Sequence, residues 1–248
     1  MSVFDKIFKP KSTRRRCAAV IVAAGNSSRM GRDKILIDLG GIPVIARTLL
    51  AFEQTEAIDE ILVVTKLDKL QEIADICSKY GISKASKVVC GGRTRAESAL
   101  AGVSQVGEDI DIIAIHDAAR PLVSSSLIER VILAAETNLA VAPAVKATDT
   151  VRILNAKGVV QQTPNREYVA LIQTPQAFSA DIIKGALTKA VEKQLHITDD
   201  CSAAELVGVK VCVIDGEPDN IKLTTSRDVY LAAKILSDKG QEFDNRRR

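Results

Sequence analysis

From Cys17 onward, short apolar runs alternate with longer segments whose apolar residues recur at helical spacing. The short runs are rich in β-branched and small residues, which is typical of strands that are buried on both faces. This alternation predicts a mostly parallel α/β sheet with helices on both of its faces. The expected strands are 18–22, 61–65, 87–89, 112–115 and 140–144, and the expected helices are 43–52, 67–79, 94–103 and 125–137.

Several residues suit the ends of these helices. Pro43 fits a first helical turn, because it has no N–H to leave unpaired there. Ser125 or Ser126 fits an N-cap, and Gly81 stands where a glycine commonly follows a helix.

The pattern changes after residue 146. Residues 149–154 and 159–162 alternate in polarity and flank a turn at 155–158, so they predict a hairpin with no helix between its strands. We expect a β-arm at about 146–172 that projects from a single domain spanning 17–237, between a basic tail (1–16) and a charged tail (238–248). Further helices are expected at 180–192, 202–206 and 227–236, with a strand at 210–214.

Composition excludes several classes of protein. The chain has 248 residues, of which 46% are hydrophobic and 26% charged, as in ordinary globular proteins. Aromatic residues make up only 3% and tryptophan is absent, which argues against modules that stack nucleic-acid bases. The net charge of +3 comes from the two ends, because the body holds 24 basic and 27 acidic residues. No specific nucleic-acid surface is therefore expected, and no apolar run reaches the length of about 18 residues that a membrane span needs.

The five cysteines form no C-x-x-C pair, and the chain has only two histidines, so a structural zinc site is not expected. An odd, scattered set of this kind fits reduced thiols in the cytoplasm. The basic N-terminus lacks the apolar core of a signal peptide.

The loop after the first expected strand, residues 23–31, is the first candidate for chemistry. Its small residues let backbone N–H groups approach an anion, and ligands of parallel α/β sheets bind at this edge. It lacks the Gly-Lys-Ser/Thr ending of a Walker A loop, and Ser27 breaks the Gly-x-Gly-x-x-Gly pattern. Arg29 and Lys34 are two cations suited to a triphosphate. Taken alone, an ordinary strand-to-helix turn with two surface cations explains the loop equally well.

Six motifs in order make a more specific pattern, which resembles the 2-C-methyl-D-erythritol 4-phosphate cytidylyltransferase family of isoprenoid biosynthesis. The likeness runs from about Cys17 to Leu236 and implies a Rossmann-like nucleotidyltransferase sheet. The opening loop is common to sugar- and polyol-phosphate nucleotidyltransferases, whereas the second and third motifs narrow the likeness to cytidylyltransferases. The motifs are residues 23–31 with Lys34, 91–98 (GGRTRAES), 116–121 (HDAARP), 174–176 (TPQ), 198–200 (TDD) and 219–222 (DNIK).

The resemblance implies transfer of CMP from CTP to the phosphate of 2-C-methyl-D-erythritol 4-phosphate, with release of pyrophosphate. The acceptor phosphate is already an anionic nucleophile, so cations are needed around the α-phosphorus and a general base is not. By resemblance, Arg29 and Lys34 stabilise the transition state, assisted by Mg²⁺ that the CTP phosphates mainly hold, with Asp117 and Asp219 as candidate protein ligands. The nucleotide-binding residues implied are Ala23, Ala24, Gly25, Gly91, Gly92, Ser98 and Asp117.

The acceptor site implied by the same resemblance includes residues of the β-arm, which in the family reaches into a partner subunit. A homodimer is therefore expected. The implied acceptor-binding residues are Asp117, Arg120, Thr150, Arg166, Thr174, Thr198 and Lys222.

Other interpretations remain open from the sequence. A ribitol-5-phosphate cytidylyltransferase shares the CTP half of these motifs, although residues 116–120 and 163–166 favour methylerythritol phosphate. An inert nucleotide sensor is disfavoured by the presence of both Arg29 and Lys34, and a nucleic-acid binder by the acidic body. Without the other motifs, Asp117 and Arg120 would be interpreted as a surface salt bridge. His116 is interpreted as structural, and Cys201 near His196 as an incidental thiol.

Overall fold

The computed structural model describes residues 14–25 and 33–245. Within these residues, the main sheet has eight strands. They are β1 (Cys17–Val22), β2 (Glu60–Thr65), β3 (Ala85–Cys90), β4 (Ile112–Asp117), β5 (Ala140–Lys146), β8 (Ala170–Ile172), β9 (Gln176–Ser179) and β10 (Cys212–Asp215). The order across the sheet is β10-β5-β9-β4-β1-β2-β3, and β8 pairs with β5.

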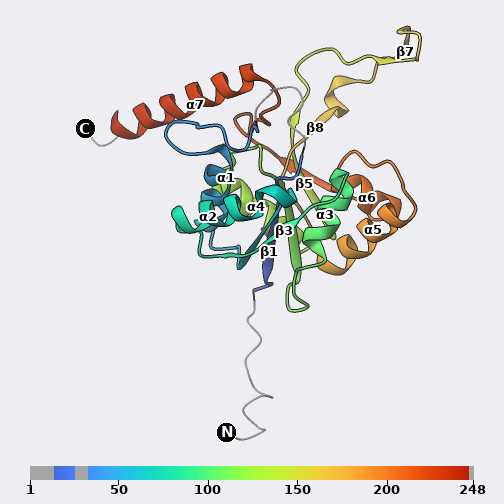
Figure 1. Ribbon diagram of the computed structural model, residues 1–248. Helices are drawn as coiled ribbons and strands as arrows, with labels where there is room; N and C mark the ends of the chain where they lie inside the picture. The colour runs from blue at the N-terminus through green and yellow to red at the C-terminus, as the bar shows by residue number, and fades with distance from the viewer. Residues whose placement is uncertain (1–13, 26–32, 246–248) are drawn as a thin grey trace, which may run out of the picture.

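Helices cover both faces of the sheet (Figure 1). One face packs against α1 (Val44–Glu53), α2 (Leu70–Lys79) and α4 (Ser125–Ala135), and the other against α3 (Arg95–Val103), α5 (Ala180–Glu192) and α6 (Asp200–Leu206). The last helix, α7 (Ser226–Asn245), contacts a third, smaller apolar cluster through Ala232. The expected fold class is confirmed.

The central strand β1 shows why a short apolar run predicts a strand of the buried sheet. Its residues 17, 19 and 21 belong to the core on one face, and residues 18 and 20 belong to the core on the other. β1 pairs in parallel with both β2 and β4, so neither of its edges is exposed. A strand buried on every side must be apolar at each position, and the sequence Cys-Ala-Ala-Val-Ile-Val meets that requirement.

The structure corrects some expected boundaries. The cap of α4 is Ser124, whose hydroxyl accepts a hydrogen bond from Leu127 N, and neither Ser125 nor Ser126. The expected helix over 67–79 is a 3₁₀ turn, η2 (Leu67–Lys69), followed by α2. Helix α7 extends to Asn245 and so includes much of the expected charged tail; an ion pair between Lys234 and Asp238, one turn apart, supports this extension.

Strand β9 is an element that the sequence analysis missed. It is buried and lies antiparallel between β4 and β5, although it has only four residues and follows Pro175 directly. A segment so short carries no periodicity of its own, so its strand geometry comes from the two neighbours that pair with it. The sheet is therefore mixed at this point and parallel elsewhere along its main path.

The region expected to form an arm contains a separate two-stranded sheet of β6 (Ile153–Leu154) and β7 (Val160–Gln162). Its strands are shorter than expected, and Figure 1 shows it lying away from the main sheet. The chain returns through a 3₁₀ turn, η3 (Arg166–Tyr168), and β8. Among the residues that the structure describes, no helix is long and apolar enough to cross a membrane.

Gly102 allows α3 to lie directly on the sheet, because a Cβ there would come within 2.5 Å of Val20 and 2.6 Å of Val64. We predict that Gly102→Ala lowers the free energy of unfolding by about 1–3 kcal/mol, the usual cost of overpacking a core. Gly185→Ala is the matched control, since Gly185 lies on the exposed side of α5 with nothing within 4 Å of its added Cβ. Urea titration should show a small gain for the control, and equal stability of the two variants would contradict this account.

Candidate active site

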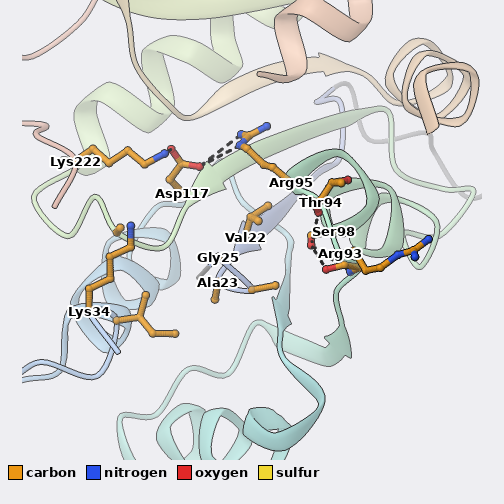
Figure 2. A pocket seen from close by; sticks show the side chains of 14 residues that line it. Val22, Ala23, Gly25, Lys34, Arg93, Thr94, Arg95, Ser98, Asp117 and Lys222 are labelled. Carbon is orange, nitrogen blue, oxygen red and sulfur yellow. Dashed lines mark hydrogen bonds and ion pairs between the residues drawn. The ribbon is translucent and has the colours of Figure 1, made fainter. Parts of the chain in front are cut away.

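Loops that follow β1, β3 and β4 surround a cavity of about 210 Å³ at the carboxyl edge of the sheet (Figure 2). Such an edge is where parallel α/β sheets bind ligands, because the loops diverge there and the helices that follow point their N-termini toward it. The cavity is lined by Val22, Ala23, Ala24 and Gly25 after β1, by Gly92, Arg93, Thr94, Arg95 and Ser98 after β3, by Asp117 and Ala119 after β4, and by Lys34, Ile35 and Lys222.

A glycine pair forms one wall of this cavity. A Cβ on Gly91 would come within 2.6 Å of the Ala24 methyl group and 2.8 Å of Ser98 Oγ. The Ser98 hydroxyl accepts a hydrogen bond from Gly92 N at 3.2 Å and donates to Thr94 O at 2.8 Å. Ala24 in the loop after β1 and Ser98 in α3 can therefore approach residue 91 this closely only because residue 91 is a glycine.

The first turn of α3 is fixed by its own side chains. Thr94 caps the helix by accepting a hydrogen bond from Glu97 N at 3.1 Å, and the Glu97 carboxylate accepts one from Arg93 N at 2.7 Å. A Cβ on Gly92 would collide with Glu97. These contacts hold the backbone of the glycine pair in one conformation before any ligand binds.

The Asp117 carboxylate is surrounded by positively charged side chains. Its carboxylate lies 2.7 Å from Lys222 Nζ, 3.4 Å from Arg95 Nε and 3.8 Å from Arg120 Nε. Figure 2 shows Lys222 and Arg95 reaching it from opposite sides. Burial alone would raise the pKa of Asp117, but the positive charges of Arg95 and Lys222 outweigh burial and hold the pKa far below its usual range.

Arg95 is held by a second carboxylate. Its two terminal nitrogens donate to the Asp200 oxygens at 2.8 Å and 2.7 Å, in a bidentate pair with a fully buried partner. Burial opposes the charge of Arg95, yet Asp200 and Asp117 outweigh it and raise the Arg95 pKa. Sequence reasoning assigned no role to either residue, although Arg95 lies inside the glycine-pair motif and Asp200 in Thr-Asp-Asp.

Two of the predicted acceptor residues lie behind the cavity wall. Arg120 donates from Nη1 to Asn220 O at 2.6 Å, and its side chain is 11% exposed. The hydroxyl of Thr174 accepts a hydrogen bond from Asp117 N at 3.1 Å, and the residue is 4% exposed. In this arrangement both side chains support Asp117 and the loop that carries Lys222.

The remaining predicted site residues fall into two groups. Ala23, Ala24, Gly25, Lys34, Gly92, Ser98, Asp117 and Lys222 come together at the cavity, and Gly91 lies beside it. Thr150, Arg166 and Thr198 are exposed and do not line it; Arg166 donates to Thr148 O, and Thr198 is hydrogen bonded to Ser202. Arg29 lies outside the described residues.

The cavity offers little protein ligation for a metal ion. The part of the chain that the structure describes contains no group of three His, Cys, Asp or Glu side chains placed to hold one. Asp219 pairs with Lys239 at 3.0 Å and does not line the cavity, which leaves Asp117 as the carboxylate beside it. One carboxylate fits an ion that is bound mainly by a substrate's phosphates, as Mg²⁺ often is.

Comparison with known proteins gives one consistent result. The family model of 2-C-methyl-D-erythritol 4-phosphate cytidylyltransferase matches residues 17–238. The cytidylyltransferase of that name from Halalkalibacterium halodurans is 39% identical over 90% of this chain and 97% of its own length. The crystal structure of 4-diphosphocytidyl-2C-methyl-D-erythritol synthase from Anaerococcus prevotii is 35% identical, covers 90% of this chain and 96% of its own, and superposes with a TM-score of 0.81. The Thermus thermophilus cytidylyltransferase is 27% identical, covers 89% and 98%, and superposes with a TM-score of 0.71.

The fully buried His116, at the end of β4, predicts a pH dependence of stability. Burial lowers the pKa of His116 to about 3, so between pH 6.5 and 3 the unfolded chain binds a proton that the folded chain does not. Stability from this group is therefore complete above pH 6.5 and is lost as the pH falls. We predict that wild type loses about 1.4 kcal/mol more than His116→Phe between pH 7.5 and 5.5, measured by urea unfolding. His196→Gln, at the exposed second histidine, should retain the wild-type dependence, whereas equal slopes for wild type and His116→Phe would refute the assignment.

Proposed function

The chain belongs to the 2-C-methyl-D-erythritol 4-phosphate cytidylyltransferase family, and from this membership we propose which of its residues carry out each part of the reaction. The enzyme transfers CMP from CTP to 2-C-methyl-D-erythritol 4-phosphate in isoprenoid biosynthesis. The observation that supports the assignment of roles is the cavity in which a glycine wall faces a cluster of cations around Asp117.

The nucleotide occupies the side of the cavity made by β1 and α3. The N–H of Ala23 is already bonded to Val64 O at 2.7 Å, so the backbone of Ala24 and Gly25, next along the loop, is assigned to donate N–H groups to phosphate oxygens. Gly91, Gly92 and Ser98 form a narrow wall that suits a flat pyrimidine. The N–H groups of both glycines are already bonded, to Thr65 O and to Ser98 Oγ, so their carbonyl oxygens are the groups assigned to accept from the amino group of cytosine. A site that pairs polar groups in this way rejects a base with a mismatched pattern of donors and acceptors.

The chemistry exchanges one phosphoryl bond for another. An oxygen of the acceptor phosphate forms a bond to the α-phosphorus of CTP, while the bond from that phosphorus to the bridging oxygen breaks and pyrophosphate leaves with the electron pair. Two anions must approach each other, so we assign Lys34 in the cavity, together with Arg29, to neutralise charge in the transition state.

Magnesium fits the same site. Asp117 is the cavity carboxylate that can contact a metal ion, and the phosphates of CTP would supply the other ligands. When bound, the ion neutralises phosphate charge and so assists departure of pyrophosphate. Five free cysteines, three of them buried, fit a reducing compartment, and we propose that the enzyme works in the cytoplasm.

The acceptor occupies the opposite side, next to Lys222. This lysine lines the cavity and already faces a carboxylate, so its ammonium is in place for an acceptor phosphate bound beside Asp117. Thr150 and Arg166 are too exposed to belong to a closed site within one chain. We propose that they complete the acceptor site of a second copy, as parts of a homodimer formed through the hairpin region.

The hairpin region has the surface that such a dimer needs. Its apolar side chains include several that are exposed, and a two-stranded sheet by itself is marginally stable in water. Pairing with an identical segment across a two-fold axis would bury them, and two-fold dimers are the commonest assembly. The exposed apolar residues are Ile153, Leu154, Val159, Val160, Tyr168, Leu171 and Ile172.

A pyrophosphate-release assay tests the function directly. We predict activity with CTP and 2-C-methyl-D-erythritol 4-phosphate, about 10²-fold lower kcat/KM with UTP, and little turnover of ribitol 5-phosphate. Lys34→Ala should lower kcat by about 10²-fold, because a preorganised positive charge is lost in the transition state. Lys193→Ala, at an exposed lysine after α5, is the matched control and should be unaffected. A preference for ribitol 5-phosphate would reassign the acceptor, and full activity of Lys34→Ala would remove the proposed role of that residue.

Mixed dimers test the shared site. Arg166→Ala and Lys34→Ala should each be nearly inactive, yet after mixing and re-annealing, heterodimers contain one active site that carries neither change. Activity should then recover to about a quarter of wild type, since half of a statistical mixture is heterodimer and each heterodimer has one intact site. Arg152→Ala, at another exposed arginine of the same region, should be active without mixing. If mass spectrometry shows subunit exchange without recovery, Arg166 does not act across subunits.

A further inference from the structure

His116 is a buried polar residue that takes no direct part in the transfer of CMP. Its ring is fully buried, does not line the cavity, and packs 4.9 Å from the ring of Phe52. Both ring nitrogens nevertheless have partners: Nδ1 lies 3.0 Å from Thr174 Oγ1, and Nε2 lies 3.3 Å from Arg120 O. Buried polar groups are normally hydrogen bonded, and here the two partners fix the orientation of the ring between Thr174 and Arg120.

The partners determine where the proton lies. The backbone carbonyl of Arg120 can only accept, so Nε2 must carry the hydrogen that it donates to this oxygen. In the neutral ring Nδ1 is then bare and accepts a hydrogen bond from the Thr174 hydroxyl. That hydroxyl in turn accepts from Asp117 N, at 3.1 Å. Each donor and acceptor in this chain is used once, and the direction of every hydrogen bond is fixed.

The chain of hydrogen bonds spans the turn from Asp117 to Arg120. One end fixes the backbone at Asp117, whose carboxylate faces Lys222 and Arg95 in the cavity. The other end fixes the Arg120 carbonyl, and the Arg120 side chain holds Asn220 O, two residues before Lys222. His116 therefore contacts both groups that position the Asp117–Lys222 pair, the Thr174 hydroxyl and the Arg120 carbonyl.

We propose that His116 is a positioning residue for cytidylyl transfer: as the neutral Nε2–H tautomer it holds the Asp117–Arg120 turn so that Asp117 and Lys222 face the acceptor. This inference rests on the function proposed above. His116 touches no substrate and exchanges no proton with one. It acts through Thr174 and through the Arg120 carbonyl.

Protonation of the ring would break the arrangement, because Nδ1–H would then compete with the hydroxyl proton of Thr174. The charged groups facing the ring are Asp117, which favours the imidazolium, and Arg120 and Lys222, which oppose it. Burial acts most strongly, and it lowers the pKa. Burial therefore favours the neutral form of the ring, which the hydrogen bonds to Thr174 and Arg120 require.

Substitutions can separate the two hydrogen bonds. His116→Gln places an amide near the Nε2 position and retains a donor for Arg120 O, whereas His116→Asn retains an acceptor near the Nδ1 position for Thr174. His116→Phe retains the ring volume and loses both. We expect His116→Phe to lower kcat/KM about tenfold or more while the protein stays folded, because small displacements of reacting groups are costly. Each amide variant should recover part of the loss.

The matched control is Phe52→Leu, which changes the packing of the same ring but none of its hydrogen bonds. It should lower stability while kcat/KM per folded molecule stays near wild type. A double-mutant cycle adds a second readout: His116→Phe and Thr174→Val break the same chain, so together they should cost less than the product of the single effects.

Nitrogen NMR reads the tautomer without any substrate. With ¹⁵N-labelled histidine the protein gives two sets of ring signals, which His196→Gln assigns. The His116 set should show protonated Nε2 and bare Nδ1 from pH 6 to 8, and Thr174→Val should shift its Nδ1 signal. An Nδ1–H tautomer would overturn the proposal, and so would kcat/KM within twofold of wild type for all three His116 variants. A wild type that transfers no CMP would instead reject the proposed function and leave the NMR result standing.

Discussion

The buried negative charge of Asp117 is the constraint on which the rest of the site depends. A carboxylate removed from water is tolerated only when it is paired, and here Lys222, Arg95 and Arg120 approach it. They come from three separate parts of the chain: the loop before α7, the start of α3 and the turn after β4. Compensation of one charge therefore brings together the segments that form the cavity. Lys34 adds a further positive charge to its lining, which suits a polyphosphate ligand.

A second layer of buried amides holds the same loops. Gln173 donates to Glu217 O at 2.8 Å and accepts from Glu217 N at 3.2 Å, and a Cβ on Gly216 would come within 2.5 Å of its amide oxygen. Asn220 donates to Thr174 O at 2.8 Å. Hydrogen bonds of this kind are directional, so they place the Lys222 loop more precisely than apolar contacts could. The apolar sheet supplies the stability, and the polar layer at its carboxyl edge supplies the geometry.

The pattern of residue types among near neighbours in the sequence was enough to predict most of the fold and most of the residues at the cavity. The strands of the parallel core are apolar at every position because they are buried on both faces, and helix α5 matches its expected bounds because its periodicity is complete. Gly91, Gly92, Ser98 and Lys34 were predicted because their types follow strand ends in motifs that resemble a known family. Each of these signals lies within about a dozen neighbouring residues.

What the sequence by itself determined is thus the order along the chain of the parallel strands and their helices, the edge of the sheet at which the cavity lies, and the family. Only the tertiary structure decided that β9 lies antiparallel within the core, that Arg95 pairs with Asp200 105 positions away, and that Thr174 and Arg120 support Asp117 from behind. The physical reason is that periodicity records whether a side chain is buried. It does not record which distant partner satisfies a buried charge or hydroxyl, because that choice exists only once the sheet has brought the segments together.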